Sequence, residues 1–289
     1  MERLTSPRVM EALLKKHGFT MNKRFGQNFL TDENIVRKIV DAAHIQPTDV
    51  VLEIGPGIGT MTRELCDRAQ TVLAVEIDDK LIPILKETLA DKDNCRLIHG
   101  DILELDMVEE LKKIDASSFK VVANLPYYIT TPIIMGLLEK DLPLESITVM
   151  IQKEVAQRIT ASPGGKDYGA LTVACGYYTR SELAFIVPAT VFYPRPKVDS
   201  AVIHLEVLSG ERMGNKEKKA FFTVVKAAFG NRRKTLLNSL SNNLSLEKEE
   251  VRQLLQLAGV EEGRRAETLS FEEFHSLAMA YGQITWPRS

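Results

Sequence analysis

Residues 50–60 constrain the fold more than any other stretch of this chain. The apolar run 50–54 leads into the turn Gly55-Pro56-Gly57-Ile58-Gly59, and a helical pattern follows from Thr60. A strand, a glycine turn and a helix in this order open a nucleotide-binding α/β unit, because glycines let the backbone approach a ligand closely. The sequence therefore predicts a parallel sheet with a ligand at its first loop.

The spacing of these glycines narrows the kind of ligand. A dinucleotide fingerprint needs its third glycine at position 60, where this chain has Thr60, and the Gly-Lys-Ser/Thr ending of a triphosphate loop is missing. The acidic Glu53 before Gly55 instead resembles the first motif of class I S-adenosylmethionine-dependent methyltransferases. Glycine turns after strands often have only a structural role, so the interpretation depends on the motifs that follow.

Two later carboxylates follow apolar runs of their own. Glu76 comes directly after the run 72–75, and Asp101 follows the run 95–99. A carboxylate at the end of the second strand can accept hydrogen bonds from both ribose hydroxyls of an adenosine cofactor, and Asp101 could accept from its adenine amine. Each alone could be a helix cap or a solvated loop residue. In order with Glu53, they predict a cofactor site along the carboxyl edge of the sheet.

The four residues Asn124-Leu125-Pro126-Tyr127 follow another apolar run and indicate the chemistry. The exocyclic amine of adenine is a poor nucleophile, because its lone pair is delocalised into the ring. The Asn124 side-chain oxygen and the Leu125 backbone carbonyl can accept both amine hydrogens. Pro126 fixes the turn, and Tyr127 or Tyr128 offers a flat face for the base. The alternative is an ordinary turn at a strand end.

Composition sets limits on the class of protein. The 289 residues are 44% apolar and 26% charged, with no apolar run near the ~20 residues of a membrane span. The N-terminus lacks the apolar core of an export signal. Cys66, Cys95 and Cys175 have no paired spacing, and the five histidines form no metal-type cluster. We therefore expect a cytoplasmic protein with reduced thiols, no membrane segment and no metal.

The charge is unevenly distributed along the chain. The net charge is −2, yet residues 211–289 carry 13 Lys/Arg against 10 Asp/Glu, a net +3. Local basic patches are what meet a phosphate backbone, although a solvated helix face is the ordinary explanation of any one cluster. The short basic clusters are Lys15-Lys16, Lys23-Arg24 and Arg232-Arg233-Lys234.

The alternation of strand and helix patterns predicts a doubly covered parallel sheet, with strands near 50–54, 71–76, 95–99, 120–124 and 147–151. Later extended runs at 183–187 and 201–207 suit the reversed last strand of a methyltransferase sheet. Between them, the Pro-rich residues 192–198 predict a rigid surface loop. The ordinary role of such a loop is to connect two strands, but an exposed Phe192 in it would be a platform for a flipped base.

A polar stretch at 209–216 marks a predicted domain boundary. Beyond it the apolar spacing of three to four residues is helical throughout, and no strand pattern appears. The expected organisation is a Rossmann-like α/β methyltransferase domain over residues 1–208 and a small all-α domain over 209–289.

These motifs together resemble the bacterial 16S rRNA adenine N6,N6-dimethyltransferases, the ribosomal RNA small subunit methyltransferase A family. The resemblance covers essentially the whole chain. The matching motifs lie at residues 25–30, 53–57, 124–128, 166–169, 192–200 and 232–236. The resemblance implies the fold predicted above and S-adenosyl-L-methionine as the methyl donor.

The resemblance also assigns roles to residues. The cofactor site would comprise Gln27, Asn28, Leu30, Gly55, Gly57, Glu76, Asp101 and Asn124. Gln27 and Asn28 would lie over the methionine end, although the sequence alone would make them an ordinary polar turn. From the residues themselves, Phe192 and Tyr127 are our candidates for holding the faces of the target base, while Asn124 and the Leu125 carbonyl would align its amine. Arg232, Arg233 and Lys234 would bind rRNA phosphates.

The implied substrate is two adjacent adenosines in a hairpin near the 3′ end of 16S rRNA, each dimethylated at N6, within a small-subunit particle or its precursor. A monomer active in ribosome biogenesis is expected. One alternative is the related macrolide-resistance methyltransferase of 23S rRNA, which usually has Ile where this chain has Leu125. Leu125 and residues 197–200 favour the 16S rRNA enzyme over this alternative. The other is a non-catalytic nucleic-acid-binding factor on the same fold.

Overall fold

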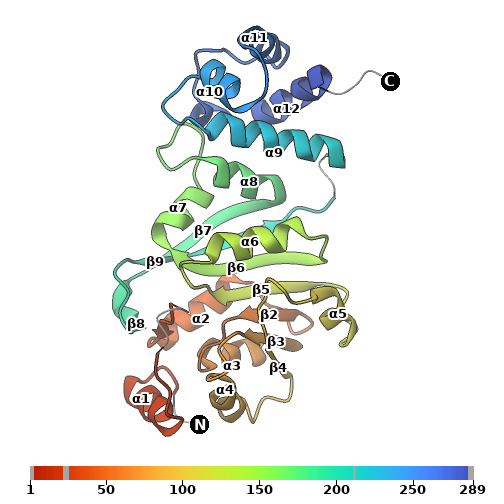
Figure 1. Cartoon of the computed structure of the whole chain (residues 1–289). Coiled ribbons are helices and arrows are strands. Elements are labelled where there is room, and N and C mark those ends of the chain that lie inside the picture. The colour runs from red at the N-terminus through yellow and green to blue at the C-terminus, as the bar shows by residue number, and fades with distance from the viewer. Residues whose placement is uncertain (1–2, 22–25, 211–212, 286–289) are drawn as a thin grey trace. The chain divides into compact units, whose positions relative to one another are not determined.

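The computed structural model describes residues 3–21, 26–210 and 213–285 (Figure 1). The chain divides into two compact units. The first comprises Met1–Ala156 and Ser181–Val207, and the second comprises Gln157–Arg180 and Leu208–Ser289. The chain therefore crosses between units before residue 208, and the segment 157–180 departs from the predicted boundary.

The described residues form a seven-stranded sheet in the order β4-β3-β2-β5-β6-β9-β7. Its strands are β2 (Val50–Ile54), β3 (Thr71–Glu76), β4 (Cys95–His99), β5 (Phe119–Asn124), β6 (Leu144–Gln152), β7 (Thr179–Val187) and β9 (Ser200–Val207). The strands from β4 to β6 run parallel, and β9 pairs antiparallel with β6. The predicted α/β class and the reversed strand are confirmed.

Helices lie between these strands in sequence, and two further short strands form a separate sheet. The helices up to β7 are α1 (Pro7–Lys16), α2 (Glu33–Ala42), α3 (Thr60–Cys66), α4 (Ile82–Thr88), α5 (Met107–Lys112), α6 (Thr130–Glu139), α7 (Lys153–Ile159) and α8 (Ala170–Tyr178). The small sheet pairs β1 (Phe29–Leu30) with β8 (Phe192–Tyr193), which follows the 3₁₀ turn Ala189–Val191. This pairing joins segments more than 160 residues apart in sequence.

Alternating side chains of the strands build one core of the first unit. Val51, Val72 and Val122 are fully buried and cluster with Ile39 of α2 and Leu65 of α3. Because side chains of a strand alternate between faces, these valines share one face of the sheet, and α2 and α3 cover it. The core holds the carboxyl ends of the central strands in fixed register.

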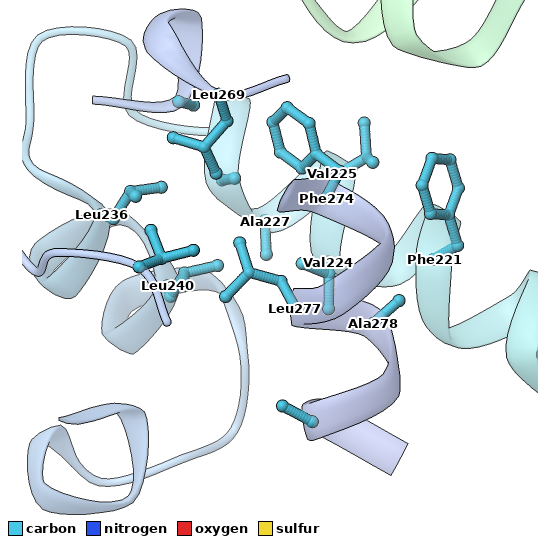
Figure 2. Close-up of a cluster of buried hydrophobic side chains, with 14 of the residues drawn as sticks. Phe221, Val224, Val225, Ala227, Leu236, Leu240, Leu269, Phe274, Leu277 and Ala278 are labelled. Carbon is cyan, nitrogen blue, oxygen red and sulfur yellow. The ribbon is translucent and has the colours of Figure 1, made fainter. Parts of the chain in front are cut away.

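The second unit has a separate apolar core. Its C-terminal helices are α9 (Asn215–Phe229), α10 (Leu236–Asn243), α11 (Lys248–Leu257) and α12 (Phe271–Thr285), with a 3₁₀ turn at Ala266–Thr268. Figure 2 shows Phe274 and Leu277 of α12 among residues of α9 and α10, including Val224 and Leu240. The described residues from 213 to 285 contain helices and no strand, as the sequence predicts.

The segment 157–180 belongs to this second core because its aromatic side chains are buried there. Tyr168 and Tyr177 are 4% and 6% exposed within the same cluster as Phe221. Tyr177 lies 5.3 Å from Phe221 between ring centroids, and Tyr168 lies 6.1 Å from Phe229. No helix in the described residues is long and apolar enough to cross a membrane.

Candidate active site

A pocket lies at the carboxyl ends of the parallel strands in the first unit. Its wall is formed by segments that follow β2, β3, β4 and β5, together with residues 26–30. Loops that leave neighbouring parallel strands meet at one edge of the sheet, which is where open α/β folds bind ligands. The pocket thus gathers the segments that carry the predicted motifs.

The glycine turn after β2 needs its glycines for two separate reasons. Gly55, Gly57 and Gly59 have φ values of +70°, +63° and +88°, a region that other residues adopt at a cost. A Cβ at Gly57 would also lie 3.1 Å from Cε1 of Phe29, and one at Gly59 would lie 2.9 Å from Oγ1 of Thr88. The turn therefore keeps the backbone at the pocket wall free of side chains.

Glu76 ends β3 and lines the pocket with a nearly buried carboxylate. It is 4% exposed, and its oxygens accept hydrogen bonds from the N–H groups of Gly57 at 3.2 Å and Asp78 at 2.9 Å. Burial raises the pKa of Glu76, and these backbone donors act in the opposite direction. The contact with Gly57 ties the carboxylate to the glycine turn.

Asp101 follows β4 and also lines the pocket. Its Oδ1 accepts from the N–H of Leu103 at 2.9 Å, which orients the carboxylate within its turn. The Oδ2 atom makes no hydrogen bond with the described residues, so one acceptor is available for a ligand. The predicted place of this carboxylate beyond the third strand is confirmed by the structure.

The segment 26–30 closes another side of the pocket and is held by several hydrogen bonds. Asn28 donates from Nδ2 to the carbonyl of Gly26 at 2.9 Å, and Gln27 donates from Nε2 to Oδ2 of Asp78 at 2.7 Å. Leu30 pairs with Phe192 in the small sheet. Gln27, Asn28 and Leu30 all line the pocket, although the Gln27 amide contacts a protein carboxylate. Phe25, Lys23 and Arg24 lie outside the described residues.

Asn124 ends β5 and lines the pocket. Its Nδ2 donates to the backbone carbonyl of Asn28 at 3.0 Å, and its Oδ1 accepts no hydrogen bond from the described residues. The carbonyl of Pro126 accepts from the N–H of Ile129 at 3.2 Å and from Oγ1 of Thr130 at 3.1 Å. The turn into α6 is therefore fixed, and the carboxamide is oriented with an acceptor left available.

Two tyrosines follow this turn and differ in exposure. The Tyr127 hydroxyl lies 2.8 Å from Oγ of Ser200, and burial raises its pKa. Tyr128 is 58% exposed, and its ring lies 3.7 Å from the position that a Cβ on Gly26 would take. Both line the pocket together with Leu125 and Pro126. Tyr127 is the anchored aromatic ring of the two.

The expectation that Phe192 is an exposed platform is wrong. Phe192 is 5% exposed and packs in the core cluster with Leu30 and Val36. Among the described residues it forms no part of the pocket wall. Its neighbour Tyr193 is 38% exposed. The reason is the pairing of β8 with β1, whose alternation turns one residue of the pair inward and the next outward.

Comparison with known proteins places the chain in a family. The sequence profile of the ribosomal RNA adenine dimethylase family matches residues 18–283.

The chain belongs to the ribosomal RNA adenine dimethylase family.

Relatives within this family match the chain over nearly its full length. The ribosomal RNA small subunit methyltransferase A of Alkaliphilus oremlandii is 49% identical over 282 residues, 96% of this chain and 98% of the relative. That of Clostridioides difficile is 50% identical over 279 residues, 96% of each. The chain is thus an rRNA adenine dimethyltransferase by family.

Solved structures of related enzymes share the fold. A dimethyladenosine transferase from Plasmodium falciparum superposes with a TM-score of 0.75 at 25% identity, covering 88% of this chain and 98% of that one. The 23S rRNA methyltransferase ErmE superposes with a TM-score of 0.70 at 29% identity, covering 88% and 100%. Both likenesses extend well beyond the glycine turn.

Glu53 is a pocket residue to which the sequence motifs assigned no role of its own. Glu53 is the last residue but one of β2. It lines the pocket and is 1% exposed. Burial raises its pKa to about 8, and Oε2 has no hydrogen-bond partner among the described residues. The acidic position before the glycine turn was the available signal, because it places a carboxyl inside the apolar end of a strand.

The basic cluster of the second unit has mixed roles. Arg232 donates to the backbone carbonyl of Lys166, and its Nε lies 3.5 Å from a Glu267 carboxylate oxygen. Arg233 and Lys234 are exposed and form no ion pair with the described residues. Arg232 therefore connects parts of the second unit, whereas its two neighbours present their charges to solvent.

Proposed function

We propose that this member of the family uses S-adenosyl-L-methionine to dimethylate N6 of two adjacent adenosines near the 3′ end of 16S rRNA. The observation that carries the proposal is the Asn124 carboxamide at the pocket. Its NH₂ is engaged by Asn28, and its Oδ1 is available to accept. The near full-length relatives at about half identity carry the name of small-subunit enzymes, which supports the choice of rRNA.

The residues of the pocket fit this cofactor. S-adenosyl-L-methionine supplies a methyl group activated by its sulfonium when it is bound. Glu76 would accept from the ribose hydroxyls, and Asp101 would accept from the adenine amine through its available Oδ2. The backbone at Gly55 would pack against the ligand in the open space where a Cβ would lie, and Gly57 would keep its place against Phe29 in the pocket wall. Asn28 and Leu30 would complete the wall on the opposite side.

Asn124 and Leu125 would perform the recognition of the reacting amine. Two acceptors, the Asn124 Oδ1 and the Leu125 carbonyl oxygen, bind the two amine hydrogens and favour a tetrahedral nitrogen with its lone pair available. The bond from Nδ2 to Asn28 prevents the carboxamide from turning its donor toward the amine. Most of the rate acceleration would then come from positioning the nucleophile in line with the methyl group.

Tyr127 is the proposed contact for the face of the target base. The base must leave its stack to enter the pocket, at a cost of about a few kcal/mol. An aromatic ring recovers part of that cost by stacking. The hydrogen bond between the Tyr127 hydroxyl and Ser200 fixes the ring before the base arrives, so little side-chain entropy is lost on binding.

The second unit, with residues 209–289, is proposed to dock the enzyme on rRNA of a small-subunit particle or its precursor. The exposed charges of Arg233 and Lys234 suit phosphate contacts that position without reading sequence. Because the substrate is an assembling ribosomal particle, the enzyme would act in the cytoplasm, as a monomer and in ribosome biogenesis.

The alternative substrate is 23S rRNA, because the chain also resembles the 23S rRNA methyltransferase ErmE. The test expresses the chain in a bacterium that lacks its own small-subunit adenine dimethyltransferase, and mass spectrometry locates dimethyladenosine in both rRNAs. We expect two adjacent dimethyladenosines in 16S rRNA, and none in a strain that carries Asn124→Ala. Dimethylation in 23S rRNA alone would support the alternative, and its absence from both would indicate a non-catalytic factor.

A further inference from the structure

Asp78 lies two residues beyond Glu76 and makes hydrogen bonds with two residues of the pocket wall, Gln27 and Glu76. It is 3% exposed. Its Oδ2 accepts from Nε2 of Gln27 at 2.7 Å, and its Oδ1 accepts from the N–H of Lys80 at 3.1 Å. Its own N–H donates to Oε1 of Glu76 at 2.9 Å. One buried residue thus contacts both the segment 26–30 and the carboxylate expected to bind the cofactor ribose.

The burial of Asp78 makes these contacts energetically important. A carboxylate removed from water needs hydrogen-bond donors, and losing one leaves a charge incompletely compensated. The amide of Gln27 is such a donor, and it comes from a segment 51 positions away in sequence. The contact therefore stabilises the carboxylate and restrains the segment at the same time.

The hydrogen bond between Gln27 and Asp78 restrains a segment that forms part of the pocket wall. Gln27 lines the pocket beside Asn28, and the Asn28 carbonyl accepts from Asn124. Glu76 in turn accepts from Gly57 in the glycine turn. A continuous series of hydrogen bonds therefore passes from the glycine turn through Glu76 and Asp78 to Gln27.

We infer that Asp78 is a positioning residue for cofactor binding, which holds Gln27 with its carboxylate and Glu76 with its N–H. The pocket is thereby arranged before the ligand arrives, so less ordering is required on binding. Gln27 acts on the cofactor site mainly through Asp78, and its contribution to affinity depends on that partner. The inference depends on the proposed function in one respect, namely that S-adenosyl-L-methionine is the ligand.

The test reverses the polarity of the pair without changing its size. Gln27→Glu places two carboxylates in contact and should weaken binding of S-adenosyl-L-methionine about 10-fold or more, the scale for losing a hydrogen bond to a charged group. Adding Asp78→Asn lets the new carboxamide accept from Lys80 and donate to the carboxylate at position 27. Affinity by titration calorimetry should then return to within about threefold of wild type.

A second readout uses the protein without cofactor. Hydrogen exchange of the backbone amides in residues 26–30 and at Gly57 should accelerate in Gln27→Glu and slow again in the double variant, because the restraint is restored. Asp79→Asn is the matched control for Asp78→Asn, since it makes the same charge change at an exposed neighbour. It should alter neither affinity nor exchange.

The results separate the possible roles of Gln27. If the double variant binds as weakly as Gln27→Glu, Gln27 contacts the ligand independently of Asp78 and the inference is overturned. Unchanged exchange in Gln27→Glu overturns it as well. Should Gln27→Glu fail to fold, Gln27→Met removes the donor at similar shape. It should weaken binding severalfold and accelerate exchange, and normal values of both would contradict the inference.

Failure of the proposed function would look different. A wild-type protein that binds S-adenosyl-L-methionine but modifies no 16S adenosine contradicts the proposed substrate and leaves the positioning role intact. The exchange measurement requires no cofactor and no RNA, so it tests the Gln27–Asp78 restraint whatever the reaction proves to be.

Discussion

At the scale of single residues, Glu53 shows how burial changes the chemistry of a carboxyl in this pocket. Its ordinary pKa of 4.5 rises to about 8 because the charged form is desolvated. Between these values the folded protein keeps the proton, whereas the unfolded chain releases it. Stability therefore falls as the pH rises from about 4.5 to about 8.

Glu53→Gln should remove this dependence. The neutral amide has nearly the same shape and no proton to lose, so the variant should be more stable than wild type at pH 7 by roughly 1–3 kcal/mol. At pH 4.5 the difference should be small. Urea unfolding at both pH values measures it, with the exposed Glu104→Gln as control. A difference that does not change with pH would contradict the raised pKa.

Asn124 carries the claim of adenine N6 chemistry. Asn124→Ala removes the acceptor and should lower the single-turnover rate about 100-fold or more if the bond strengthens in the transition state. Asn124→Asp keeps an acceptor but places an oxygen against the Asn28 carbonyl, where Nδ2 donated at 3.0 Å. We expect the Asp variant to react faster than the Ala variant, and both well below wild type.

The controls for Asn124 are binding measurements. Affinity for the small-subunit particle should be nearly unchanged in both variants, because the phosphate contacts proposed for docking lie elsewhere. Full activity of Asn124→Ala would show that Asn124 is only a turn residue, and the adenine chemistry proposed for this pocket would lose its main support.

At the scale of elements, local pattern predicts the parts of the site that follow consecutive strands. Glu53, Glu76, Asp101 and Asn124 end or follow parallel strands, and parallel strands bring such positions to one edge whatever their distance in sequence. Their convergence on one pocket could therefore be anticipated from the spacing of apolar runs.

Long-range pairing explains what local pattern does not predict. The strands β1 and β8 have two residues each, too few for an alternation to be recognised, so the burial of Phe192 has no sequence signal. The contact of Gln27 with Asp78 is equally non-local. The segment 157–180 joins the second core through buried tyrosines. Its two ends lie inside α7 and β7, so no loop marks the places where the chain changes unit.

The glycine turn makes a prediction at this same scale. Gly57→Ala strains a backbone with φ of +63° and places a methyl group 3.1 Å from Phe29. We expect a loss of about 1–3 kcal/mol in stability and about 10-fold or more in affinity for S-adenosyl-L-methionine, because Phe29 or the turn must shift within the pocket.

Gly164→Ala is the matched control for this change. Gly164 has φ of +85°, but no atom lies within 4 Å of the position of its Cβ, and it belongs to the second unit. It should share the backbone strain and leave cofactor affinity unchanged. Equal affinity of the Gly57→Ala and wild-type proteins, by calorimetry, would show that the turn does not contact the ligand.

At the scale of the whole molecule, chemistry and docking are assigned to different units. The pocket lies wholly in the first unit, and the basic cluster 232–234 belongs to the second. Arg232 is engaged by Lys166 and Glu267 inside its own unit. Its replacement would therefore combine a loss of stability with any loss of RNA binding, and it is unsuited to test docking alone.

Arg233 and Lys234 allow a cleaner test because their charges are exposed and not engaged by the described residues. Changing both to Gln should weaken binding to the small-subunit particle and reduce the slope of log affinity against log salt by about 1–2, since fewer counterions are released. The control changes Lys248 and Arg265 to Gln, which removes two exposed charges from the same unit. Cofactor affinity should be the same in all three proteins. If the salt slope of the first pair matches that of the control, the basic cluster is an ordinary solvated surface, and rRNA must be bound by another part of the enzyme.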